Sequence, residues 1–196
     1  MPLSSASRAA LLDAARISLI EALQLAPKHA PPIPPDENEL TSAAGCFVSL
    51  HQIQTHRLRG CVGRLDPKQS LWQAVWETAA DVLRDPRFLN DPVTLREIPS
   101  LEIEISVLSK PALATDPEAF EPLVHGIYLI CNDRSGFFLP QVARETGWTK
   151  EQLLNRLCTE KRSLPADAWR SPAAQLHTFD VELIGPEAVD PTSGKQ

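Results

Sequence analysis

The sequence has little of what nucleic-acid-binding, secreted and membrane proteins carry. It has 19 Lys and Arg against 25 Asp and Glu, a net charge of −6, and the basic residues form no run. Nucleic acids and acidic lipid surfaces attract basic protein surfaces, so we expect neither as a partner. The N-terminal stretch is apolar in parts, but Asp13, Arg16 and Glu21 interrupt it. It resembles neither a signal peptide nor a membrane span, and we expect a cytoplasmic protein.

Cysteine is also scarce, and its spacing excludes the usual structural sites. The four cysteines lie far apart, with no Cys-x-x-Cys pair and no Cys/His cluster of ligand spacing. In a cytosolic protein such residues are free thiols rather than a disulfide framework or a zinc site. The chain also lacks a Gly-rich phosphate loop and a Ser-centred nucleophile elbow, so we expect no metal and no cofactor.

The residues that are present predict a globular α+β protein. With 43 % apolar and 22 % charged residues in 196, the chain suffices for one core or for two small subdomains sharing one. Short hairpins and strands with polar residues on alternate positions favour antiparallel pairing. The expected fold is a mainly antiparallel mixed sheet with flanking helices.

Hydrophobic periodicity and turn residues predict where the elements lie. We expect one domain over 1–185, with a Pro-rich connector (26–39) inside it and a disordered tail (186–196). The predicted helices span 7–25 (capped by Ser7), 66–84 (capped by Asp66), 140–146 and 149–160 (capped by Thr149). The predicted strands span 45–53, 57–65, 100–111, 125–132 and 176–185, with a turn at 133–136.

The segment "HRLRGCVGRL" (56–65) carries the clearest candidate for chemistry. Residues two apart on a strand share a face, so Arg59 and Cys61 are expected to project together. A nearby guanidinium favours the reactive thiolate and lowers its pKa, and Gly60 and Gly63 leave room for a ligand to approach. The alternative is an inert buried thiol whose glycines serve packing, with the arginine extending to solvent.

Further residues fit a role beside Cys61, and each has a plain structural alternative. Glu104 shares the polar face of its strand and is a candidate acid or base, or part of a solvated face. His125 is a candidate base toward Cys61, or a capping histidine. Arg87 is expected to pair with Asp85 across a turn. Arg87 and Gln141 are also candidate binding residues.

A series of short segments resembles the AMMECR-type domain family, also called AmmeMemoRadiSam system protein A. The resemblance covers nearly the whole chain. It is carried by "GCFVSL" (45–50), "LRGCVG" (58–63), "DPRF" (85–88), "EISVL" (104–108), "HGI" (125–127), "FLPQVA" (138–143) and "LPADAW" (164–169).

The resemblance implies two subdomains around a cleft, with the "LRGCVG" strand near it. It also implies a functional association with a Memo-like protein, itself similar to non-haem iron extradiol dioxygenases, and with a radical SAM enzyme. Two hypotheses follow. One is a thiol-dependent enzyme in which Arg59 and His125 or Glu104 support Cys61 in group transfer on a small metabolite or modified residue. The other is a non-catalytic adaptor that binds those partners.

Overall fold

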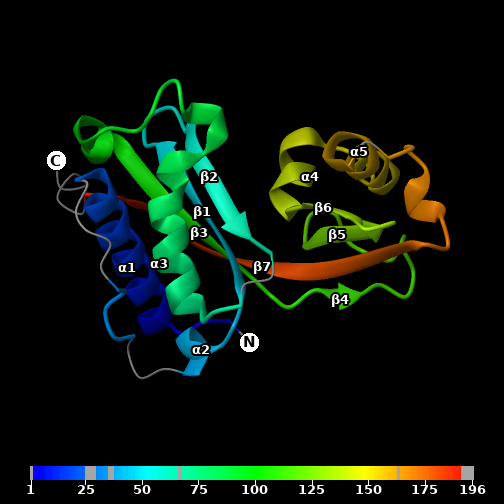
Figure 1. Cartoon of the computed structure of the whole chain (residues 1–196), viewed down its shortest axis with the longest axis horizontal. Coiled ribbons are helices and arrows are strands. Elements are labelled where there is room, and N and C mark those ends of the chain that lie inside the picture. The colour runs from blue at the N-terminus through cyan, green and yellow to red at the C-terminus, as the bar shows by residue number, and fades with distance from the viewer. Residues whose placement is uncertain (1, 25–29, 35–37, 66–67, 163, 191–196) are drawn as a thin grey trace. The chain divides into compact units, whose positions relative to one another are not determined.

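The chain folds into two compact units, each built on antiparallel strands, and the long strand β7 belongs to both. The computed structural model describes residues 2–24, 30–34, 38–65, 68–162 and 164–190. Unit 1 comprises Met1–Leu108 and Glu182–Gln196, and unit 2 comprises Ser109–Val181. The helices and antiparallel strands of Figure 1 confirm the predicted α+β class.

Unit 1 is a sheet covered on one face by helices. Its strand order is β2-β1-β3, followed by the last part of β7. Its elements are α1 (Ser5–Leu23), α2 (Asn38–Thr41), β1 (Gly45–Gln52), β2 (Leu58–Arg64), α3 (Leu71–Asp81), β3 (Leu101–Leu108) and the end of β7 (Ala174–Ala188), with 3₁₀ turns η1 (Val82–Arg84), η2 (Pro86–Phe88) and η3 (Leu95–Ser100).

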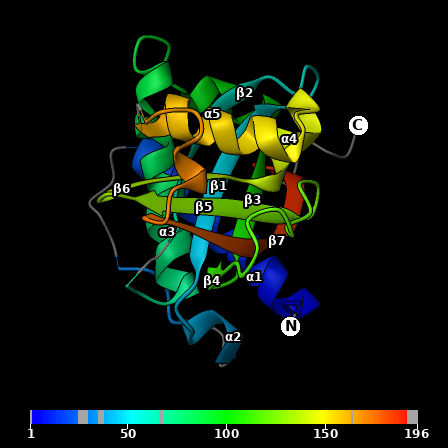
Figure 2. The same ribbon diagram turned by 90° about the vertical axis from the view of Figure 1, so that its right-hand side faces the viewer.

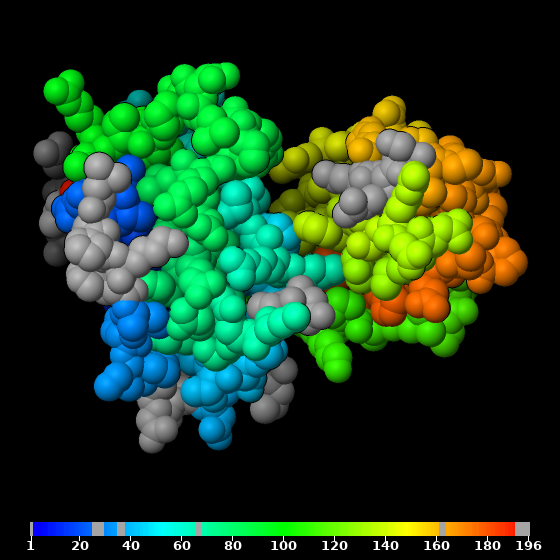
Figure 3. Space-filling model, viewed as in Figure 1, coloured from blue at the N-terminus to red at the C-terminus, as the bar shows by residue number. Residues whose placement is uncertain are grey.

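Alternation along the strands decides which face of this sheet is covered. Cys46, Val48 and Leu50 of β1 are fully buried and join the core formed with α1 and α3. The two helices lie side by side, and parts of both are visible on one face of unit 1 (Figure 3). The intervening residues, among them Ser49, therefore belong to the opposite face of the sheet.

Helices α1 and α3 of unit 1 begin at residues other than those predicted. α1 begins at Ser5, and its cap is Ser4, whose hydroxyl accepts the Ser7 N–H. Ser7 is buried and donates to Glu39 at 2.8 Å. α3 begins at Leu71 after the cap Ser70, so the predicted cap Asp66 is wrong and itself lies outside the described residues. Ser7 thus lies inside α1 with its hydroxyl bound to Glu39, and Ser70 caps α3 by accepting the Gln73 N–H at 3.3 Å.

Unit 2 is a smaller sheet with two helices, shown facing the reader in Figure 2. Helices α4 and α5 match the predicted segments, and Thr149 caps α5 by accepting the Gln152 N–H at 3.3 Å. The core gathers residues of the sheet and of α5, such as Leu129, Phe138 and Leu157. The elements are β4 (Ala112–Leu113), β5 (His125–Cys131), β6 (Arg134–Phe138), α4 (Pro140–Thr146), α5 (Lys150–Arg162), η4 (Ala168–Arg170) and the first part of β7.

One turn of unit 2 differs from the prediction. The β5–β6 turn consists of Asn132 and Asp133, with φ of 48° and 62°, because these two residue types tolerate the left-handed region. The predicted 133–136 turn is therefore shifted, and Arg134–Phe138 form β6.

The tail and the connector also hold structure that the sequence did not indicate. β7 continues to Ala188, and the fully buried Val189 donates its N–H to Leu101 at 2.8 Å. The prediction of disorder from residue 186 is therefore wrong for 186–190, while 191–196 lie outside the described residues. In the connector, residues 30–34 form neither helix nor strand, α2 begins at Asn38, and 25–29 and 35–37 are not described.

No helix within the described ranges is both long and apolar enough to cross a membrane.

Candidate functional site

Cys61 lies on the edge strand β2, and a turn following α3 binds its backbone. The Cys61 N–H donates to Asp85 Oδ2 at 2.9 Å, and its carbonyl accepts from Arg87 Nη2 at 3.2 Å. Both backbone groups of Cys61 thus point away from β1. Ser49 of β1, directly opposite, is therefore in a non-hydrogen-bonded pair with Cys61, the type that brings side chains closest together.

The turn is held by Asp85 and Arg87, which pair as the sequence predicted. The Asp85 carboxylate is 3 % exposed and accepts from the backbone N–H, Nε and Nη2 of Arg87 at 3.0, 3.0 and 2.6 Å. These hydrogen bonds, with that from Cys61, lower the pKa of Asp85 to about 2 against the opposing effect of burial. A carboxylate and a guanidinium therefore flank the backbone of Cys61.

The side chain of Cys61 begins a polar row across three strands. Ser49 pairs with Cys61 on one side and with Glu104 of β3 on the other. The three residues share the sheet face opposite the helices. The predicted candidate Glu104 is thus separated from Cys61 by one hydroxyl, whereas Ser49 was not singled out from the sequence. Its only signal is a polar residue within the apolar string "GCFVSL".

The environment of Cys61 keeps its thiol protonated. Burial raises its pKa, while a hydrogen bond with Ser49 and the charge of Arg87 lower it. The carboxylates of Asp85 and Glu104 raise it further. The prediction of a lowered pKa is therefore wrong in direction. The cation that favours the thiolate is Arg87 and not Arg59.

Arg59 is turned away from this chemistry by a β-bulge. Leu50 pairs with Gly60 but His51 pairs with Leu58, so Arg59 is an extra residue on β2 and the two-residue alternation breaks there. The expectation that Arg59 and Cys61 act together rested on that alternation.

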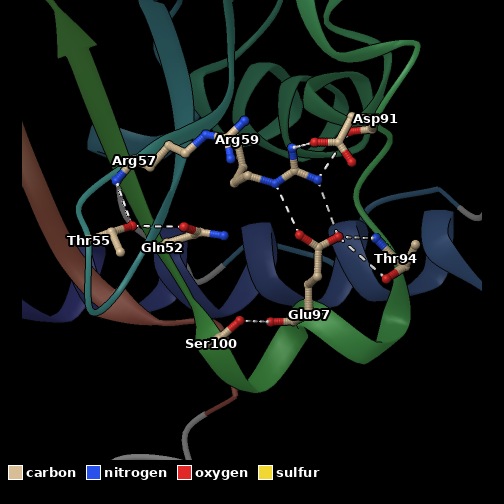
Figure 4. Close-up of polar contacts among 8 residues, drawn as sticks. All are labelled: Gln52, Thr55, Arg57, Arg59, Asp91, Thr94, Glu97 and Ser100. Carbon is tan, nitrogen blue, oxygen red and sulfur yellow. Dashed lines mark hydrogen bonds and ion pairs between the residues drawn. The ribbon is translucent and has the colours of Figure 1, made fainter.

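The Arg59 side chain, 2 % exposed, binds the loop before β3 (Figure 4). Its Nε donates to Glu97 at 3.0 Å and its Nη1 to Asp91 at 2.9 Å. The same Glu97 carboxylate accepts the Thr94 N–H at 2.9 Å. Arg59 therefore joins β2 to η3, and two carboxylates balance its charge.

The two glycines beside Cys61 serve packing within unit 1. A Cβ on Gly63 would collide with the Phe47 ring and the Cys46 carbonyl, and one on Gly60 would lie 2.9 Å from the Val82 carbonyl. The space at Gly63 is thus filled by Phe47 instead of standing open above the sulfur. The packing alternative holds for both glycines.

His125 and Gln141 belong to unit 2. The His125 Nδ1 accepts the Glu121 N–H at 2.9 Å, and its Nε2 lies 3.9 Å from Asp180 Oδ1. Gln141 lies in the first turn of α4. Cys61 belongs to unit 1, so a common site of these residues with Cys61 stays a prediction.

The other three cysteines are buried, as expected, whereas Cys61 is half-buried. Burial raises the pKa of Cys46 to about 11 and also raises that of Cys158. Among the described residues, no group of three His, Cys, Asp or Glu side chains is placed to hold a metal ion.

Comparisons with known proteins identify relatives along most of the chain. The AMMECR1 family pattern matches residues 12–184. Protein MJ0810 of Methanocaldococcus jannaschii is 34 % identical over 154 residues, 75 % of this chain and 74 % of that protein. Protein MK0488 of Methanopyrus kandleri is 35 % identical over 162 residues, 78 % and 76 % of the two chains. The crystal structure of PH0010 from Pyrococcus horikoshii matches with a TM-score of 0.77 at 32 % identity and covers 88 % of each chain.

Proposed function

Since the chain belongs to the AMMECR1 family, we propose that it is a thiol-dependent enzyme in which Cys61 accepts an acyl or similar group. The donor is a small metabolite or a modified residue. The observation that carries the proposal is the row Cys61–Ser49–Glu104, in which strand register puts one serine between a half-buried thiol and a carboxylate on one face of the sheet.

The row supplies a route for the thiol proton. Because the thiol is protonated at rest, its proton must leave as the sulfur attacks, and Ser49 can pass it to Glu104. With an acyl donor, the S–C bond forms, the bond to the leaving group breaks, and Glu104 returns the proton to that group. Water then hydrolyses the thioester, which frees the acid and restores the thiol.

Arg87 is the proposed binding residue for the donor. Its guanidinium is 57 % exposed, and within the described residues its Nη1 makes no hydrogen bond. An oxygen-rich group of the donor can accept from this nitrogen without disturbing the pair with Asp85.

A generic acyl donor tests the proposal. We expect p-nitrophenyl acetate to release p-nitrophenolate with an initial burst and to leave an acetyl group on Cys61, seen by peptide mass spectrometry. Cys61→Ala should abolish the burst, and Glu104→Gln should slow it by about 10²-fold, the usual loss on removing a general base. The buried Cys158→Ala is the matched control and should behave as the parent protein.

Two outcomes would overturn the proposal: acetyl transfer to Cys61 no faster than to Cys158, or a Glu104→Gln variant as fast as the parent. His125 remains the rival base. If His125→Ala slows acetyl transfer by about 10²-fold and Glu104→Gln does not, the proton goes to His125.

The second candidate function is an adaptor for a Memo-like protein and a radical SAM enzyme. Exposed apolar side chains of unit 2 favour it, since Leu113, Leu123 and Val124 are 61, 58 and 56 % exposed. In co-expression with the cognate partners, we expect a Leu123→Asp/Val124→Asp variant to lose co-purification and Cys61→Ala to keep it. Empty pull-downs of the parent protein would contradict this function.

For either function we propose a cytoplasmic location. All four cysteines are free, a state that a reducing compartment maintains. Fractionation of cells that express the tagged protein should recover it with cytoplasmic markers.

A further inference from the structure

The surface of α5 in unit 2 carries a hollow whose lining includes none of the candidate residues described above. Its volume is about 300 Å³, at the lower end of small-molecule sites. It is lined by Trp148, Gln152, Asn155, Arg156, Thr159 and Ala166. Three of these, at positions 152, 155 and 156, lie on one face of the exposed helix seen in Figure 2.

The hydrogen bonds of the two amides occupy one lone pair of each oxygen and orient the NH₂ donors. Asn155 Oδ1 accepts from the Trp169 indole at 2.8 Å, and Gln152 Oε1 accepts from the Thr149 N–H at 2.9 Å. Indole and backbone N–H groups can only donate, so these partners fix the orientation of both amides. Both NH₂ groups, which make no hydrogen bond to any described residue, remain for a ligand.

Arg156 adds the positive charge, and Trp148 adds the apolar wall. The guanidinium lies 5.2 Å from the centroid of the Trp148 ring, and its Nη1 donates to Glu160 at 2.8 Å. That ion pair is exposed on both sides, so it holds Arg156 only weakly. The remaining nitrogens of Arg156 are donors as well.

We propose that this hollow binds a small carboxylate with an apolar body. Two amide NH₂ groups and a guanidinium match the oxygens of a carboxylate. The Trp148 ring and the Ala166 methyl group match the apolar body. Thr159 donates its proton to the Asn155 backbone carbonyl at 3.1 Å, so its hydroxyl oxygen stays an acceptor in the hollow. The site is independent of the chemistry at Cys61.

Phenylacetate is the probe, and its neutral counterpart phenylacetamide is the matched control. In ¹H–¹⁵N spectra of the full chain, we expect phenylacetate at about 10 mM to shift the Trp148 indole and the Asn155 and Gln152 NH₂ signals. Phenylacetamide should shift them at least about tenfold less, since it lacks the charge.

Two isosteric variants test the donors without disturbing the fold. Asn155→Asp keeps an oxygen for Trp169, and Gln152→Glu keeps one for Thr149, yet each replaces an NH₂ group by a charge that repels the probe. Both should abolish binding, and Arg156→Gln should weaken it about tenfold. Arg170→Gln is the control, because Arg170 also stacks on a tryptophan, 4.1 Å from the Trp169 ring, but does not line the hollow. It should bind as the parent does.

The proposal is overturned if phenylacetate shifts none of these signals, or if phenylacetamide shifts them equally. Unchanged affinity in Asn155→Asp and Arg156→Gln would overturn it too. Binding of inorganic phosphate in place of phenylacetate would likewise contradict a carboxylate site.

Discussion

Asp85 joins two parts of the candidate site that are far apart in the sequence. Its carboxylate accepts from the Cys61 backbone and from Arg87, and it is almost fully buried. A buried carboxylate is stable only when its oxygens are paired. The charge of Asp85 therefore holds the turn against the edge of β2.

Replacing Asp85 tests this role through its acid dependence. The pKa of Asp85 in the folded protein, about 2, lies below the ordinary 3.8. Its stabilisation is thus present above pH 4 and is lost as the pH falls toward 2. Asp85→Asn should lower the free energy of unfolding by about 2 kcal/mol at neutral pH. It should also flatten the acid limb between pH 4 and 2, measured by denaturant unfolding across a pH series.

Asp81→Asn is the control for Asp85. Asp81 is 40 % exposed and pairs with Arg84 on the surface, so its loss should cost little. An acid limb as steep in Asp85→Asn as in the parent protein would contradict the assigned pKa.

Gly63 is required by the ring that lies over it. Because a Cβ would collide with Phe47 and the Cys46 carbonyl, Gly63→Ala should destabilise the protein by about 1–3 kcal/mol. Cys61→Ala, two residues before Gly63 on the same face of β2, adds no atoms. It should lower the melting temperature less than Gly63→Ala does. Equal melting temperatures for Gly63→Ala and the parent would show that the space above Gly63 is open.

At the scale of elements, the edge strand β2 depends on two arginines with separate roles. Arg59 lies at the bulge and binds the loop before β3, whereas Arg87 binds the turn at Cys61. Glu97 and Asp91 hold the guanidinium of Arg59, and Asp85 holds that of Arg87. Only Arg87 acts on the thiol of Cys61.

The pH profile of Cys61 alkylation separates the two arginines. Arg59→Met should destabilise the protein by about 1–3 kcal/mol, because it removes the hydrogen bonds to Glu97 and Asp91, yet it should leave the profile unmoved. Arg87→Met should shift the profile to higher pH, since it removes the charge that lowers the thiol pKa. Labelling with limiting iodoacetamide across a pH series, followed by peptide mass spectrometry, measures the profile of Cys61 in both variants. A shift in Arg59→Met alone would reverse the assignment.

At the scale of the whole molecule, unit 2 is an insertion between β3 and the last part of β7. Its two ends are tied together, since the Ser109 N–H donates to the Asp180 carbonyl at 3.0 Å and the Ser109 hydroxyl accepts the Asp180 N–H at 2.9 Å. It also has a core of its own. These features are those of a segment that folds alone.

We therefore expect residues 109–181, expressed alone, to fold cooperatively. At about 70 residues, the fragment should be marginally stable. Dispersed amide signals and a single thermal transition would show this. A Leu157→Ala fragment, with a cavity in that core, should lose the transition. A parent fragment with collapsed amide dispersion would show that the core of unit 2 depends on the rest of the chain.

From the sequence alone, it was possible to predict the α+β class, most helices and strands, and the burial of Cys46, Cys131 and Cys158. These features depend on local periodicity and turn residues, which are properties of neighbouring positions. The candidates Cys61 and Glu104 were also visible, because alternation assigns a face to each residue of a regular strand. The pairing of Asp85 with Arg87 followed from their closeness in the chain.

The surroundings of Cys61, by contrast, depend on contacts between distant segments of the chain. Strand register places Ser49 between Cys61 and Glu104, and register depends on pairing between distant segments. The bulge at Arg59 breaks the alternation on which the prediction rested, and no pattern in β2 alone reveals it. The pKa of Cys61 is raised because burial outweighs Arg87, and burial is set by packing of the whole fold.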